Sequence, residues 1–83
     1  MRYTVTWTKK AEDQLAFYWM NTKDRQRLAD ASDRIDRQLK NDPDQQAVPF
    51  GEFYVYKVSP LAVLLRIRPD DRIIEVIEVL PFE

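Results

Sequence analysis

The sequence predicts an α+β domain in which a two-helix hairpin packs on one face of a four-stranded antiparallel sheet. Three observations lead to this prediction. Residues 2–7 alternate apolar and polar side chains, residues 9–40 carry apolar side chains at three- and four-residue spacing, and residues 53–80 form three segments rich in β-branched residues and separated by turn residues. The predicted order is therefore strand, helix, helix and three strands. Eighty-three residues suffice for one domain but not for two hydrophobic cores, so we expect a single domain, 1–83.

The first predicted strand is Arg2–Trp7, and its inward-facing side chains are expected to be Tyr3, Val5 and Trp7. Thr8 is a suitable N-cap for the helix that follows, because its hydroxyl can accept a hydrogen bond from a free N–H group of the first turn. This helix has an apolar stripe that we expect to face the core, formed by Ala11, Leu15 and Tyr18 or Trp19. Asn21-Thr22 ends it.

The second predicted helix is Lys23–Lys40, and its apolar stripe consists of Leu28, Ala31, Ile35 and Leu39. Its opposite surface has three acid-first pairs at i,i+4 spacing, Asp30–Arg34, Asp33–Arg37 and Asp36–Lys40. Each such pair stabilises a helix by ~0.2–0.5 kcal/mol. Asn41-Asp42-Pro43 ends the helix, since proline cannot continue its hydrogen-bond ladder. The polar stretch Asp42–Gly51 is expected to be a loop.

Three strands are predicted in the last third of the chain, Phe53–Val58, Leu61–Arg68 and Arg72–Leu80. The first two are joined by a turn at Ser59-Pro60. The second turn is Pro69-Asp70-Asp71, in which proline presets the first turn position and aspartate stabilises turn geometry. Such closely connected strands form an antiparallel meander.

Strand alternation leaves apolar side chains on both faces of this meander, although the helices can cover only one. The face turned away from the helices is expected to carry Val55, Ala62, Leu64, Ile74, Val76 and Leu80. A contiguous exposed apolar patch usually marks an interaction site, so we expect these residues to bind a partner protein or a second copy of the chain. The alternative is that one strand has a different register and part of the set belongs to the core.

Aromatic residues have two interpretations. Tyr54 and Tyr56 could stack on a nucleic-acid base, but we expect them to pack beneath the helices with their hydroxyls at the rim. A second aromatic group is expected to belong to the core near the junction of the first strand and helix, and it consists of Trp7, Phe17, Tyr18 and Trp19.

The composition excludes several kinds of chemistry. The chain has no histidine and no cysteine, which rules out imidazole acid–base catalysis, thiol nucleophiles and zinc sites built from these residues. We expect neither a cofactor nor a metal. The net charge of −1 argues against a surface uniformly adapted to nucleic acid. Because no segment resembles a membrane span or a signal peptide, we expect a cytoplasmic protein with no membrane partner.

Three cations are the candidate catalytic residues. Lys57, Arg66 and Arg68 share a predicted strand face, where they could hold a scissile phosphate and stabilise the charge that develops on its oxygens. The alternative is a solvated strand face, or ion pairs with Glu75 and Glu78.

The chain resembles the RelE/ParE superfamily of type II toxin–antitoxin toxins, which includes plasmid stabilisation proteins. The resemblance covers nearly the whole chain and rests on apolar spacing as well as on the order of the elements. Its segments are Tyr3–Ala11, Asp30–Leu39 with Asn41-Asp42-Pro43, Pro49-Phe50-Gly51, and Tyr54–Val58 leading into Leu61–Ile67.

The resemblance implies a small toxin that is neutralised by a cognate antitoxin. RelE-type members are metal-independent ribonucleases that cut mRNA on the ribosome, whereas ParE-type members are associated with DNA gyrase. Lys57 matches a basic position of the RelE-type set. Ala62 stands where an arginine is usual, and Leu80–Glu83 lacks the expected arginine and the aromatic acid–base group.

Three functions follow as alternatives. The chain could be a toxin that acts through protein contact, a metal-independent mRNA interferase with weak activity, or a non-toxic binding or dimerisation module. The residues favour action through protein contact and the non-toxic module. The expected partners are an antitoxin or a second copy on the outer sheet face, and the ribosome with its mRNA or DNA gyrase as target.

Overall fold

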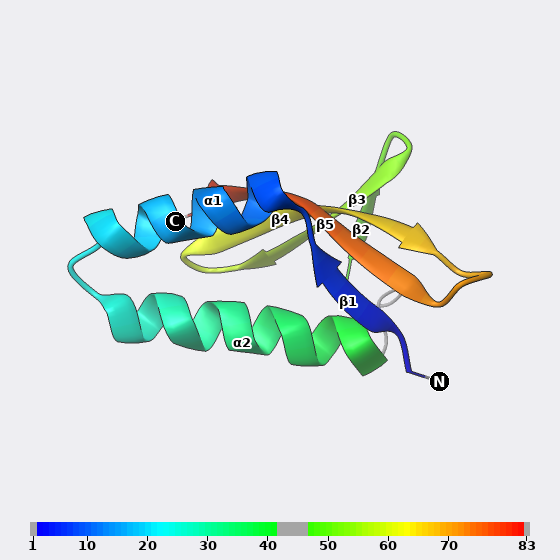
Figure 1. Cartoon of the computed structure of the whole chain (residues 1–83), viewed down its shortest axis with the longest axis horizontal. Helices are drawn as coiled ribbons and strands as arrows, with labels where there is room; N and C mark the ends of the chain where they lie inside the picture. Colours follow the sequence, from blue (N-terminus) through cyan, green and yellow to red (C-terminus); the bar gives the residue numbers. More distant parts are fainter. Residues whose placement is uncertain (1, 42–46, 83) are drawn as a thin grey trace.

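The computed structural model describes residues 2–41 and 47–82 and confirms the α+β class. Within these residues it has two helices and five strands. The helices are α1 (Lys9–Asn21) and α2 (Arg25–Asn41), and the strands are β1 (Thr4–Trp7), β2 (Val48–Phe50), β3 (Phe53–Val58), β4 (Leu61–Arg68) and β5 (Ile73–Pro81). The two helices run antiparallel, beside a strongly twisted sheet (Figure 1).

The strands form one sheet in the order β1-β5-β4-β3-β2. The predicted meander is confirmed, because β3, β4 and β5 pair antiparallel. The prediction of an entirely antiparallel sheet is wrong, since β1 runs parallel to β5. This direction has a physical reason: α1 begins directly after β1 and must continue along the far half of β5, which β1 leaves unpaired (Figure 1).

The prediction of four strands is also wrong, because Val48–Phe50 forms the short edge strand β2 within the stretch expected to be a loop. Gly51 has a φ of 62°, which a two-residue hairpin turn requires and which glycine adopts without strain. Pro49 is tolerated because β2 is an edge strand, where proline is allowed. Of the rest of the predicted loop, Ala47 is buried, and 42–46 lie outside the described residues.

The start of α1 closes the free edge of β5. The predicted N-cap is confirmed, since the Ala11 N–H donates to Thr8 Oγ1 over 3.2 Å. The Thr8 N–H donates to the carbonyl of Val76 over 3.0 Å. One turn later the Val79 N–H donates to the side-chain oxygen of Gln14 over 2.8 Å. Helix α1 therefore takes over hydrogen bonds that another strand would otherwise make.

The predicted stripe of α2 is confirmed, because all four of its apolar residues are buried. They meet Val63 and Leu65 of the sheet in one hydrophobic cluster. On α1 only Ala11 is buried. The predicted core aromatic group is therefore wrong in two members, since Phe17 is 55% exposed and Trp19 is 41% exposed. Because α1 lies along the edge of the sheet, it buries a narrower stripe than α2.

A β-bulge in β5 changes which side chains face the core. Leu65 of β4 pairs with Val76, but its neighbour Leu64 pairs with Glu78, so Ile77 is an extra residue. The bulge reverses the alternation, and both Val76 and Val79 become fully buried.

The prediction that Ile74 and Val76 belong to a partner-binding outer face is therefore wrong. Both are fully buried members of the hydrophobic core. The sequence interpretation extended one alternation pattern through the whole of β5, and a single extra residue is enough to invert it.

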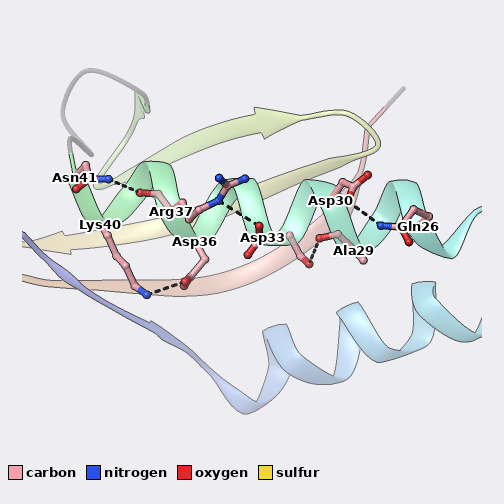
Figure 2. Close-up of polar contacts among 9 residues, drawn as sticks. Gln26, Ala29, Asp30, Asp33, Asp36, Arg37, Lys40 and Asn41 are labelled. Atoms are coloured by element: carbon pink, nitrogen blue, oxygen red, sulfur yellow. Dashed lines mark hydrogen bonds and ion pairs between the residues drawn. The ribbon is translucent and has the colours of Figure 1, made fainter.

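Two of the predicted ion pairs lie along α2 (Figure 2). Arg37 Nε lies 3.2 Å from a carboxylate oxygen of Asp33, and Lys40 Nζ lies 2.9 Å from one of Asp36. The third acid, Asp30, accepts instead from the Gln26 amide over 2.9 Å. These exposed contacts contribute little to stability. Neither α1 nor α2 is long and apolar enough to span a membrane.

The bulge makes a testable distinction between neighbouring strand positions. Val76→Asp places a carboxylate in the closed core, so we expect it to lower the free energy of unfolding by about 3 kcal/mol or more. Leu64→Asp, at a half-buried outer position, should cost only about 1 kcal/mol. Urea unfolding followed by circular dichroism measures both. Equal losses would show that the assignment of faces is incorrect.

The contact between Gln14 and β5 gives a second prediction. Gln14→Ala leaves the Val79 N–H without its acceptor, which should destabilise the fold by about 1–3 kcal/mol. Gln14→Glu keeps an acceptor oxygen at the same distance from the backbone and should therefore lose clearly less stability. Thermal unfolding compares the two variants, and hydrogen exchange at Val79 should accelerate only in Gln14→Ala. Unchanged exchange at Val79 in Gln14→Ala would contradict this role.

Candidate functional site

The outer sheet face, as we define it, is the face that carries Lys57 and Leu64 and turns away from the hydrophobic core. The strand register groups its side chains into cross-strand rows. One row is Val48, Val55, Leu64 and Glu78, and another is Lys57, Ala62 and Leu80. Phe50 pairs with Phe53 and Arg66 pairs with Glu75, and the two pairs meet where Arg66 lies over the Phe53 ring. The face therefore combines apolar, cationic and acidic side chains.

The three candidate catalytic cations lie on this face but in different rows. Lys57 is opposite Ala62, and Arg66 follows Ala62 by four residues along β4. Four residues of a strand span about 13 Å. Arg68 lies two residues further on, opposite Ile73. The backbone positions of the cations are therefore spread along the strand.

Each cation has a separate neighbour. Lys57 Nζ lies 5.1 Å from the centroid of the Phe82 ring, and Arg66 Cζ lies 5.3 Å from that of Phe53. Such cation–π contacts stabilise exposed sites by about 0.5–1 kcal/mol.

The third cation, Arg68, has an acidic neighbour. Its Nη2 lies 3.5 Å from Glu75 Oε1, which is the ion pair that the sequence offered as an alternative. The other acid named there, Glu78, pairs instead with Lys10 of α1 over 2.9 Å. The three cations therefore do not form one anion-binding cluster.

The end of the chain supplies an aromatic ring to this face without an acid–base group. The Phe82 N–H donates to the Pro60 carbonyl over 2.8 Å, which holds the segment against the start of β4. Its ring covers Lys57. Ala62, opposite Lys57 in the register, is buried. The phenyl ring of Phe82 cannot donate or accept a proton.

The apolar part of the outer face differs from the expected set. Val55 and Leu64 are half-buried there, and Leu80 is 46% exposed. Sequence analysis missed Val48 and Phe50, which are largely exposed on β2. The sequence signal for this edge strand is the segment Val48-Pro49-Phe50, which has apolar residues two positions apart and is followed by the only glycine of the chain.

A pocket of about 530 Å³ lies at this end of the sheet. It is lined by Val48, Pro49, Phe50, Val55, Tyr56 and Lys57. The apolar surface of the outer face therefore lies closer to β2 than the sequence predicted. In the pocket it adjoins Lys57.

Tyr56 faces the opposite side of β3 and belongs to the core, as predicted. Burial raises the pKa of its phenol above the ordinary value of 10.0, while the positive charge of Arg34 on α2 opposes part of this shift. Tyr54 is half-buried and packs against the same core. These tyrosines are not placed to stack on a ligand at the outer sheet face.

Among residues 2–41 and 47–82, no group of three or more acidic side chains is arranged to hold a metal ion. The polar side chains of the outer face are dispersed cations and two glutamates, beside aromatic and apolar side chains.

The raised pKa of Tyr56 predicts a pH dependence of stability. The folded state retains the phenolic proton more strongly than the unfolded chain, so this contribution is complete below pH 10 and is lost as the pH rises through the folded pKa. Tyr56→Phe should therefore lose less stability above pH 10 than the wild type. Arg34→Gln should delay the ionisation of Tyr56 further, which tyrosinate absorbance measures. An equal loss of stability above pH 10 in Tyr56→Phe and the wild type, measured by urea unfolding, would contradict the assignment.

Comparisons with models of protein families and with curated protein sequences find no match. Solved structures do match. In the toxin–antitoxin complex RelBE2 from Mycobacterium tuberculosis, the matched chain is 20% identical with a TM-score of 0.79, and the alignment covers 98% of this chain and 99% of that one.

Two further structures match over similar lengths. The YoeB/ParE toxin from Agrobacterium tumefaciens is 18% identical with a TM-score of 0.72, covering 96% of this chain and 98% of that chain. The chromosomal ParDE toxin–antitoxin system from P. aeruginosa is 16% identical with a TM-score of 0.67, covering 99% and 98%. The fold implied by the sequence resemblance is confirmed: this chain has the fold of the RelE/ParE superfamily of toxins.

Proposed function

We propose that this chain is the toxin of a type II toxin–antitoxin module, acts in the cytoplasm, and is neutralised when an antitoxin segment covers its outer sheet face. The fold supports this proposal, because the likeness to a chain of the RelBE2 complex extends over 98% of the molecule. The ParDE system gives a second likeness of the same extent.

The apolar side chains of the outer sheet face support antitoxin binding there. Val48, Val55 and Leu64 form a continuous cross-strand row, and Leu80 lies on β5 in the neighbouring row, opposite Ala62. An extended or helical segment that buries this row gains the hydrophobic free energy of the apolar area it removes from water. A second copy of the chain could cover the same row, which is the alternative partner.

The proposed mode of action is contact with a protein target, in the manner of ParE-type toxins. The observation that carries this choice is the separate engagement of the three cations by Phe82, Phe53 and Glu75. Stabilising a reacting phosphate requires donors that converge on its oxygens before the reaction. Here Lys57 and Arg66 would first have to leave their aromatic neighbours.

Weak, metal-independent mRNA cleavage remains the second candidate. It is favoured by one specific observation, which is that Lys57 and Arg66 each lie beside an aromatic ring on the same face. Cations beside aromatic rings can hold single-stranded nucleic acid through phosphate contacts and base stacking. The third candidate is a non-toxic dimerisation module of the same fold.

Expression of the chain in a bacterial host separates these functions. We expect it to arrest growth, and we expect the double variant Lys57→Ala/Arg66→Ala to arrest growth to a similar extent, because contact with a protein target does not need a phosphate site. Mapping of mRNA 5′ ends should reveal no new cleavage in either case. Lys9→Ala/Lys23→Ala, which removes two exposed cations on the helix side, is the matched control away from the face.

Two other outcomes would support the alternative functions. New mRNA ends that disappear in the double variant would establish the ribonuclease and refute action by contact. Normal growth despite folded protein would favour the non-toxic module. If the product of the adjacent small reading frame restores growth for the wild type, Leu64→Asp should prevent that rescue, because it places a charge in the proposed antitoxin contact.

A further inference from the structure

A groove of about 650 Å³ runs between α1 and α2, on the helix side of the molecule. Each helix lines it with residues at positions i, i+3, i+4 and i+7. These residues are Glu12, Leu15, Ala16 and Trp19 on α1, and Ala29, Ser32, Asp33 and Asp36 on α2. Trp7 of β1 completes the lining. The groove remains open because alanine and serine occupy positions where larger side chains would fill it.

The groove has a length suited to a short peptide segment. Seven residues of a helix rise about 10 Å, which corresponds to two helical turns. A helix that enters a groove of this length can anchor apolar side chains at i and i+4 or at i and i+7.

The two ends of the groove differ in character. Because α1 and α2 are antiparallel (Figure 1), Trp19 near the end of α1 lies across from the first half of α2, where Ala29 is located. Glu12, near the start of α1, lies toward the second half of α2, which carries Asp36. One end thus has the apolar side chains of Trp19 and Ala29, and the other combines carboxylates with Trp7.

All charged residues that line the groove are acidic. Within residues 2–41 and 47–82, Glu12 has no ion-pair partner, while Asp33 and Asp36 pair with Arg37 and Lys40 of their own helix. The Asp33–Arg37 pair is about two-thirds exposed on both sides, so a competing cation can replace the arginine at little cost.

We propose that this groove binds a cationic, amphipathic helical segment of a partner protein, with apolar side chains against Trp19 and Leu15 and lysine or arginine side chains against Glu12, Asp33 and Asp36. The acidic rim supplies the charge complementarity that selects such a segment and repels phosphate backbones. This site is separate from the outer sheet face and does not depend on the toxin assignment.

Both tryptophans of the chain line the groove, so their fluorescence reports its occupancy directly. The probe is a capped helical peptide of about four turns, free of tryptophan and tyrosine, with leucine and phenylalanine on one face and lysine on its flanks. Its counterpart replaces every lysine with glutamate. We expect the lysine peptide to shift the tryptophan emission to shorter wavelength in a saturable manner, and the glutamate peptide to leave it unchanged.

Matched charge reversals test the site. Glu12→Lys/Asp33→Lys reverses two carboxylates of the groove, and Asp13→Lys/Asp30→Lys makes the same change in net charge at exposed positions outside its lining. The groove variant should bind the lysine peptide about tenfold more weakly, and the control within about twofold of the wild type. Ala16→Leu, which fills the groove without altering charge, should also weaken binding.

Four results would overturn the proposal. Equal losses in the two double variants would show that only net charge matters, and equal binding of both peptides would show a non-selective apolar surface. Absence of binding by the lysine peptide to the folded wild type would refute the site. If the wild type self-associates in light scattering and the groove variant alone becomes monomeric, a second copy occupies the groove in place of a partner's helix.

Discussion

The structure depends on how the backbone groups along the two edges of β5 find hydrogen-bond partners. One edge pairs with β4, and the other is shared between β1, which pairs with the first half of β5, and α1, which lies along the second half. Thr8 and Gln14 make the polar contacts of that second half. A buried strand edge without partners would cost about 1–3 kcal/mol for each unpaired group. This requirement determines the direction of β1 and the position of α1.

The position of α1 explains why the helix side has a groove. Helix α2 covers the centre of the sheet with a fully buried stripe, whereas α1 is held at the edge by its contacts with β5. The two helices leave between them a space that Ala16 and Ala29 do not fill. Trp19 is 41% exposed and lines this groove. The same geometry therefore stabilises the sheet edge and creates a surface suited to a partner.

Two surfaces of the molecule differ in charge, because the outer sheet face mixes three cations with Glu75 and Glu78, whereas the charged residues that line the groove are all acidic. The outer sheet face carries Lys57, Arg66 and Arg68 among apolar side chains, while the groove between the helices has carboxylates at its rim. The net charge of −1, from 13 basic and 14 acidic residues, does not reveal this distribution. Partners of different chemistry can consequently bind the two surfaces, and an electrostatic preference for each is built into the fold.

The sequence by itself determined the features that depend on neighbouring residues. Apolar spacing located α2 and its buried stripe, Thr8 was identified as the N-cap of α1, and the meander followed from alternation and turn residues. The resemblance of apolar spacing also led to the correct fold class. These signals are local, since each depends on residues within about two helical turns or one strand and its turn.

Only the tertiary structure decided the features that depend on distant partners. The extra residue Ile77 inverts the faces of β5 and moves Ile74 and Val76 from the expected patch into the core, because register is set by pairing with β4 and not by alternation alone. The exposure of Trp19 follows from the edge position of α1. The separation of Lys57 from Arg66 likewise depends on the cross-strand register, because a shared strand face does not specify which residues of neighbouring strands lie opposite one another.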